Sequence, residues 1–280
     1  MIIHQSEIRR ENGQYIVFSR IEYDHDYNLP NGHWFSVDEE VSNITTSRAD
    51  IFLSTLIRVA RAIGEDIEVR GDVSPQLLFG LREYLKVHAA WSGNPDIINL
   101  NAVNRIPAKR PTQEAAVSCN ISGGIDSFHA LWSQLPENEP SAALQVKYGI
   151  YGLGLSSPFR NDFLRQTYVP SLKNMLQSLG VKLLVVDSNV QLFSFPDPWL
   201  PISTTRIAIP QIFFTVDLNS FCAFIRYFYG TKTHGYKSPH RSSFFTRDIT
   251  NIYSFGRHYK VCEAARNVKL AVLLRISPSL

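Results

Sequence analysis

Two glycines, two serines and an aspartate lie close together in the hexapeptide Ser122-Gly123-Gly124-Ile125-Asp126-Ser127. It follows a short apolar run and precedes apolar residues at helical spacing, so we expect it to connect a strand to a helix. A helix N-terminus presents backbone N–H groups without partners in the helix, together with a partial positive charge. Two glycines let the backbone bend toward a phosphate, and the hydroxyls of Ser122 and Ser127 can add hydrogen bonds. The hexapeptide therefore predicts an anion-binding loop at the carboxyl end of a parallel strand.

Asp126 needs a separate explanation, because a carboxylate beside a polyphosphate is repulsive. A Mg²⁺ ion between the two groups would remove the conflict, since this ion binds both carboxylate and phosphate oxygens. Asp126 is therefore a candidate metal ligand. The alternative is that its side chain only caps the helix.

This segment resembles the signature S-G-G-x-D-S of the PP-loop ATP pyrophosphatases, which belong to the adenine nucleotide α-hydrolase-like superfamily. The match covers Ser122, Gly123, Gly124, Asp126 and Ser127. The resemblance implies ATP and Mg²⁺ as cofactors and cleavage of ATP between its α and β phosphates. AMP would be transferred to a carbonyl or carboxylate oxygen of an acceptor, and a nitrogen or sulfur nucleophile would then displace it. The likeness is good from residue 115 to about residue 187 and fades afterwards.

The family resemblance implies further site residues outside the loop. Residues at the end of the second strand contact adenine in the family, which here points to Tyr151 in the segment 148–154. An equally open alternative is that these aromatic residues belong to the core. Basic residues late in the chain neutralise phosphates in the family, which points to Lys232 as a catalytic residue and to Lys237 and Arg241 as phosphate ligands. A solvated loop is the alternative for these three.

The chain also departs from several members of the family. It has no cysteine before Cys119, so it lacks the N-terminal nucleophile of the glutamine-using members. It has no C-terminal cysteine cluster that could hold zinc. Cys222 and Cys262 could act as the cysteine pair of thiolation enzymes only if the fold brings them together.

Strands and helices should alternate in the second part of the chain. Apolar runs predict strands, and residues at helical spacing between them predict helices. The expected strands are 115–121, 142–151, 181–187 and 223–229. Helices are expected after the hexapeptide, with the apolar stripe Phe128, Leu131, Trp132 and Leu135, after a cap at Asn161 or Asp162, and over 205–215. Pro210 weakens the last helix. The pattern predicts an α/β fold with a doubly wound, mainly parallel, Rossmann-like sheet and helices on both faces.

The first part of the chain should form a smaller α+β domain. Asn12-Gly13 predicts a hairpin, because both residues tolerate positive φ. Ser47 and Asp50 resemble a capping box for a helix that ends near Ile63. A short strand is expected at 67–69, and Ser74-Pro75 should begin a second helix. Two prolines and three basic residues make 104–112 a predicted linker, so we expect domains at 1–110 and 111–280.

Composition and charge limit the class of protein. The chain has 280 residues, 44% of them hydrophobic and 19% charged, which is ordinary for a globular protein. Three separated cysteines without a C-x-x-C pair favour a reducing cytoplasm, and no apolar run approaches a membrane span. From residue 219 onward, ten Lys or Arg residues face two acidic ones. Such a region suits a triphosphate or RNA, or it is a solvated basic face.

Three functions fit these residues. The first is an ATP-dependent adenylating enzyme that acts on a small-molecule acceptor, and we favour it. The second is an RNA-modifying enzyme with the same chemistry, although RNA-binding proteins are usually more basic overall. The third is a non-catalytic protein that binds a nucleotide through the same loop.

Overall fold

A single mixed sheet runs through the whole structure. The computed structural model describes residues 1–92, 94–107, 116–155, 157–194, 205, 208–213 and 218–222. Ten strands form the sheet; nine follow the order β10-β7-β8-β9-β4-β3-β1-β5-β6, and β2 pairs with β3 beside this path. Neighbouring strands along the path are parallel except at β9–β4, β4–β3 and β3–β1. The expected α/β class is confirmed, and the sheet is mixed and mostly parallel along this path.

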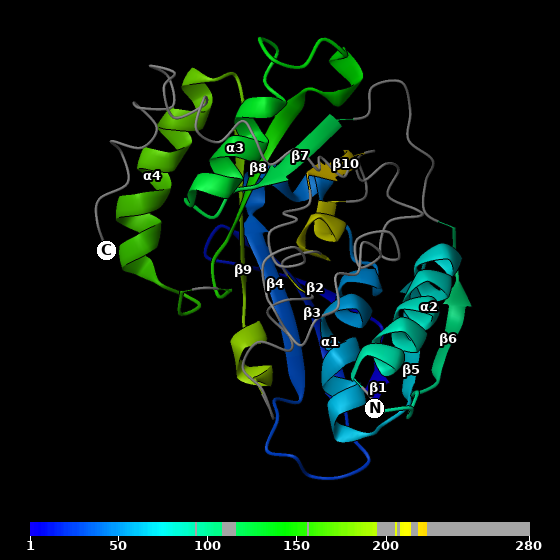
Figure 1. The fold of residues 1–280 in the computed structure, drawn as a ribbon. Helices are drawn as coiled ribbons and strands as arrows, with labels where there is room; N and C mark the ends of the chain where they lie inside the picture. Colours follow the sequence, from blue (N-terminus) through cyan, green and yellow to red (C-terminus); the bar gives the residue numbers. More distant parts are fainter. Residues whose placement is uncertain are drawn as a thin grey trace.

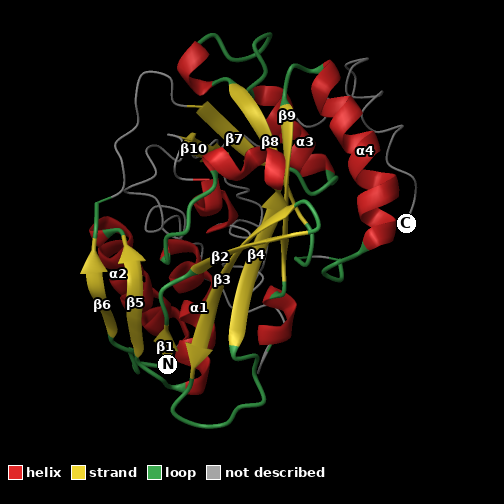
Figure 2. Cartoon of the chain, turned by 180° about the vertical axis from the view of Figure 1, so that it is seen from behind, coloured by secondary structure: helices red, strands yellow, loops and turns green. Residues whose placement is uncertain are grey.

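The strands are β1 Ile2–Ile3, β2 Glu7–Glu11, β3 Gln14–Glu22, β4 Gly32–Asp38, β5 Ile67–Val73, β6 Leu100–Arg105, β7 Ala116–Asn120, β8 Val146–Gly152, β9 Lys182–Ser188 and β10 Leu218–Cys222. The α-helices are α1 Asp50–Ile63, α2 Pro75–Ser92, α3 Ile125–Ser133 and α4 Asp162–Ser178. Short 3₁₀ helices are η1 Glu39–Ile44, η2 Ala142–Leu144, η3 Val190–Phe193 and η4 Ile209–Phe213. In Figure 1, α1 and α2 lie beside β5 and β6, and α3 and α4 lie alongside β7, β8 and β9, with which they share an apolar cluster. From behind, β3 and β4 run between these two groups of helices (Figure 2).

Helices cover both faces of the sheet around β8 and β9. Leu183 and Val185 of β9 pack in one apolar cluster with residues of α3 and α4. The alternate residues Leu184 and Val186 pack in a second cluster with residues of α1, η3 and η4. Successive strand side chains point to opposite faces, so a strand covered on both faces must be apolar at nearly every position. This explains why apolar residues are nearly continuous in the run 181–187 instead of alternating with polar residues.

The four parallel strands β7 to β10 are not added to the sheet in one direction: β8 and β9 follow on one side of β7, and β10 lies on its other side. From β7 the chain passes through α3 to β8 and through α4 to β9, each strand lying beside the previous one. It then returns past η3 and η4, which pack on the opposite face, and β10 pairs in parallel with the other side of β7. The boundary between β7 and β10 is therefore a topological switch point. Open α/β sheets bind ligands at the carboxyl ends of the strands at such a point.

The N-terminal elements follow their local signals with one exception. Asn12 and Gly13 have φ values of 51° and 73° and form the two-residue loop of the β2–β3 hairpin, as predicted. The Ser74 hydroxyl accepts a hydrogen bond from the Leu77 N–H at 3.4 Å, so the cap of α2 is confirmed. The predicted capping box at Ser47 is wrong, because α1 begins at Asp50 after Ala49 without a side-chain cap.

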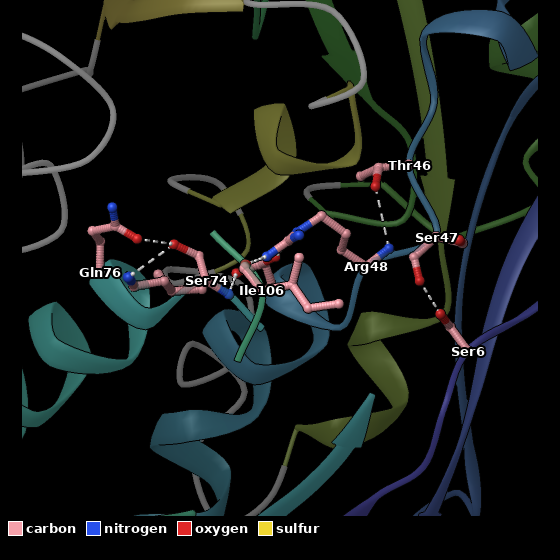
Figure 3. A network of polar contacts seen from close by, with 9 residues as sticks. Ser6, Thr46, Ser47, Arg48, Ser74, Gln76 and Ile106 are labelled. Carbon is pink, nitrogen blue, oxygen red and sulfur yellow. Dashed lines mark hydrogen bonds and ion pairs between the residues drawn. The ribbon is translucent and has the colours of Figure 1, made fainter. Parts of the chain in front are cut away.

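A buried ion pair replaces the expected cap at the start of α1. The Asp50 carboxylate binds the Arg48 guanidinium and accepts the Ser74 N–H at 2.8 Å. Arg48 also donates to the Ile106 carbonyl at 2.7 Å, as Figure 3 shows. Burial raises the pKa of Asp50. The contacts join the first turns of α1 and α2 to the end of β6, so Asp50 acts between elements rather than within its own helix.

The segment 104–112, predicted as a linker, begins inside the sheet. Asn104 and Arg105 belong to β6 and pair with β5, so the prediction is wrong for these two residues. Residues 108–115 lie outside the described part of the chain. The ranges 1–110 and 111–280 are joined by antiparallel pairing of β4 with β9, for example Val37 with Val186. The division into two domains stays a prediction.

The C-terminal expectations are tested only in part. The expected strand 223–229 lies outside the described residues, and β10, just before it, was not predicted. Thr205 is helical, but 209–213 form the 3₁₀ helix η4 around Pro210 rather than a continuous α-helix. Within the described ranges, every helix is too short or too polar to cross a bilayer.

A buried histidine fastens β4 to the segment that follows β9. The His33 ring contacts the Asn189 amide oxygen through Nδ1 at 2.9 Å and the Thr55 hydroxyl through Nε2 at 3.2 Å. Asn189 also accepts the Trp34 N–H and donates to the Gly32 carbonyl. Complete burial lowers the pKa of His33 to about 4.

We predict that His33 makes stability depend on pH. Its folded-state pKa of about 4 lies below that of a free histidine, about 6.5, so the unfolded chain takes up the proton first as the pH falls. The free energy of unfolding should therefore drop by roughly 3 kcal/mol between about pH 6.5 and pH 4. In urea titrations, His33→Gln should lose this part of the pH dependence, and the exposed control His25→Gln should keep it. Parallel curves for His33→Gln and the unaltered chain would contradict the prediction.

Candidate functional site

The hexapeptide 122–127 leaves the sheet at the switch point. After β7, the Ile121 N–H donates to the Ile150 carbonyl of β8 at 2.8 Å, and the chain then turns into α3. β10 lies on the other side of β7. In the described part of the chain, the loop therefore follows a strand from which the neighbouring connections diverge to opposite faces. The predicted strand–loop–helix arrangement is confirmed.

Two serines and two glycines hold the loop in shape. Gly123 has φ of 81° and Gly124 is the extended N-cap of α3, which begins at Ile125. The Ser122 hydroxyl donates to Ser127 Oγ at 3.3 Å, and the Ser127 hydroxyl donates to the Gly124 carbonyl at 2.8 Å. Each serine thus uses its single hydrogen inside the loop. To donate to a phosphate, either hydroxyl would have to give up the hydrogen bond that it donates inside the loop. Their contacts with phosphate stay a prediction.

The outer side of the loop is open. Ser122 and Gly124 are exposed and the Ile125 side chain is 54% exposed, whereas Ser127 is buried beneath them. At the start of α3, the Gly124 N–H donates to Ser122 Oγ at 3.4 Å and the Ser127 N–H donates to the Gly124 carbonyl at 3.1 Å. The Ile125 N–H lies between them, before the first hydrogen-bonded turn of the helix. The positive end of the α3 helix dipole faces the exposed side of the loop. The arrangement can hold an anion through backbone groups alone.

Asp126 lies in the first turn of α3 and is half-buried. The N-cap is Gly124 and no side chain caps the helix, so a capping role for Asp126 is not what the structure has. In the described part of the chain, no three His, Cys, Asp or Glu residues gather as metal ligands. Mg²⁺ in nucleotide sites is commonly held by one or two carboxylates together with phosphate oxygens. A single Asp126 fits an ion that arrives with a nucleotide better than a resident ion.

Tyr151 and Tyr168 stand next to the loop. Tyr151 belongs to β8 and Tyr168 to α4, and their ring centroids are 5.3 Å apart. Tyr151 is 9% exposed and packs in the cluster beneath α3 and α4, where burial raises its pKa to about 12. Its ring therefore contributes to the core, and a contact with adenine stays a prediction. A Cβ atom added to Gly123 would overlap the Tyr168 hydroxyl.

Asp187 is a buried acid that the sequence did not single out as part of the site. It is the penultimate residue of β9, at the same carboxyl end of the parallel strands as the loop, and is 2% exposed. Its carboxylate accepts the N–H groups of Arg160 at 3.0 Å and Ser188 at 2.8 Å, and it lies 3.6 Å from the Arg165 guanidinium. Burial raises its pKa. The only sequence signal is an acid at the end of an apolar run.

Arg165 carries this network to a further strand. Its guanidinium also donates to the Asp38 carboxylate at the end of β4, at 3.2 Å. The two ion pairs fix the first turn of α4 against β9 and β4. Tyr168 follows Arg165 by three residues on the same helix, so the network also positions the tyrosine beside the loop.

The remaining predicted site residues cannot be placed. Lys232, Lys237 and Arg241 lie outside the described residues, as does Cys262. Cys222 is in register with Cys119 on the neighbouring strand β7. Its suggested pairing with Cys262 is therefore untested.

Comparison of the chain with family models, with curated proteins and with solved structures finds no match. The assignment of the site accordingly depends on the motif and on its geometry in the fold.

We predict that Gly123 tolerates a side chain less well than another glycine with the same backbone. Gly180 has φ of 72° and open space around its Cβ position, so Gly180→Ala should cost only the left-handed strain of about 1–2 kcal/mol. Gly123→Ala should cost about 1 kcal/mol more, because its methyl group meets Tyr168. Adding Tyr168→Phe should recover the difference in urea unfolding. Equal losses for the two glycine variants would show that Tyr168 does not occupy this space.

Proposed function

We propose that the chain is an ATP-dependent adenylating enzyme of the PP-loop type. The loop Ser122–Ser127 binds ATP with Mg²⁺, ATP is cleaved between the α and β phosphates, and AMP passes to a carbonyl or carboxylate oxygen of a small-molecule acceptor. A nitrogen or sulfur nucleophile then displaces AMP. The observation that carries this proposal is the position of the S-G-G-x-D-S sequence: its outer side is exposed, it begins a helix, and it lies at the switch point of the sheet.

The backbone is the main phosphate ligand in this proposal. The first N–H groups of α3 and the helix dipole provide positive potential without any cationic side chain in the loop. Lys232, Lys237 and Arg241 are proposed to supply the remaining neutralisation from the basic C-terminal region, with Lys232 as a catalytic residue. Without such cations, a loop of six residues that contains an aspartate would hold a triphosphate weakly.

Asp126 is the residue that separates catalysis from binding alone. Its carboxylate would hold Mg²⁺, which neutralises charge on the phosphates as the leaving pyrophosphate departs. A protein that only binds a nucleotide has no need of this acid in an anion site. The two possibilities therefore differ in what the loss of Asp126 does.

The proposed reaction predicts which phosphates are released. ATP labelled at the α or γ phosphate, incubated with Mg²⁺, a small-molecule cell extract and ammonium or sulfide, should give AMP and pyrophosphate. Asp126→Ala should reduce turnover by at least about 100-fold, the scale of losing one charge-stabilising group in a transition state, while ATP affinity changes only a few-fold. The matched control is Asp162→Ala, which removes an exposed acid from the first turn of α4.

Two results would overturn this function. One is release of ADP and phosphate without AMP. The other is a calorimetric titration in which Mg²⁺ and ATP give no binding at millimolar concentration. Equal turnover of Asp126→Ala and the unaltered chain would remove the role given to Asp126.

A further inference from the structure

The hydroxyl of Tyr168 occupies the space that a side chain of residue 123 would fill. The overlap of a Gly123 Cβ with this oxygen places the phenol against the loop backbone. Gly123 is therefore constrained twice, by its φ of 81° and by the neighbouring phenol. The Tyr168 hydroxyl of α4 therefore lies beside Gly123, a residue that has no side chain of its own.

The phenol is held in this place from two directions. Its ring packs on Tyr151 with an angle of 52° between the ring planes. The first turn of α4, which carries Arg165, is fixed by the ion pairs with Asp187 and Asp38. Tyr168 is thus placed by β8 and β9 rather than by the loop itself. A ligand would meet a hydroxyl that is already positioned.

Among the described residues, the hydroxyls of Ser122, Ser127 and Tyr168 lie at the loop, and of these three only that of Tyr168 donates no hydrogen bond. Ser122 donates to Ser127, and Ser127 donates to the Gly124 carbonyl. In contrast, the Tyr168 hydroxyl makes no hydrogen bond to any described residue, although it is half-buried. Burial raises its pKa, so the hydroxyl keeps its proton at neutral pH. Leaving a partly buried donor without an acceptor is costly, and an acceptor oxygen from a ligand would remove that cost.

We propose that the Tyr168 hydroxyl donates a hydrogen bond to a phosphoryl oxygen held by the loop 122–127. This inference rests on the proposed function and adds a side-chain ligand to a site otherwise built from backbone N–H groups. The ligand class is a polyphosphate, because the hydroxyl would recognise a phosphoryl oxygen and no other part of a nucleotide. Tyr168 then supplies a neutral donor, whereas Ser122 and Ser127 already donate their hydrogens inside the loop.

The test is to remove one oxygen atom with Tyr168→Phe. The variant keeps the ring packing on Tyr151 and loses only the hydroxyl that has no acceptor among the described residues, so its unfolding midpoint in urea should not fall. By calorimetry, its affinity for inorganic pyrophosphate and for Mg²⁺ with ATP should fall about 10-fold, or about 1.4 kcal/mol. Tyr148→Phe is the matched control, because Tyr148 lies on the same strand as Tyr151 and packs on the opposite face of the sheet.

A spectroscopic measurement separates a ligand contact from a structural role. Adding pyrophosphate to the unaltered chain should produce a tyrosine difference spectrum in the near ultraviolet, and Tyr168→Phe should lose it. If the unaltered chain binds pyrophosphate and ATP and Tyr168→Phe binds them equally well, the inference is wrong and the proposed function stands. If the unaltered chain binds neither, both are wrong.

Discussion

The bend at Gly123 and Gly124 is the constraint on which the site depends. It turns the chain from β7 directly into α3, so that the first N–H groups of the helix point out of the sheet instead of into another strand. A positive φ at residue 123 and the hydroxyl of Tyr168 beside it exclude larger residues. The two serines then close the bend from within. The result is a turn that presents the N-terminus of α3 on its exposed side, which is the physical requirement for binding an oxyanion without large rearrangement.

The sheet gives this bend its position. Connections from β7 onward cover one face with α3 and α4, and the return to β10 covers the other face with η3 and η4. The carboxyl end of β7 is where those layers separate. The antiparallel strands β3 and β4 extend the sheet on the other side of β9, and the buried His33–Asn189 contact joins them to it. The N-terminal elements thus support the carboxyl end of β9, which carries Asp187, the ion-pair partner of Arg165.

The sequence predicted what local chemistry decides. Asn12-Gly13, Ser74-Pro75 and the Asn161 cap each depend on neighbours within three residues, and the structure has all of them. The strand–loop–helix course around 122–127 is equally local. The cap at Ser47 failed because Asp50 is recruited by Ser74, which is 24 residues away. Pairing of β4 with β9, the place of β10 beside β7, and the contact of Tyr168 with Gly123 all join distant segments. Patterns with periods of two or 3.6 residues carry no information about which distant segments meet.

The most direct measurement of the central claim is a crystal structure of the chain with Mg²⁺ and a non-hydrolysable ATP analogue. The account predicts phosphate oxygens within about 3 Å of the backbone nitrogens at the start of α3, with the Mg²⁺ ion beside Asp126 and the Tyr168 hydroxyl directed at the same phosphate. A nucleotide bound elsewhere, with the loop 122–127 covered by other parts of the chain, would contradict it.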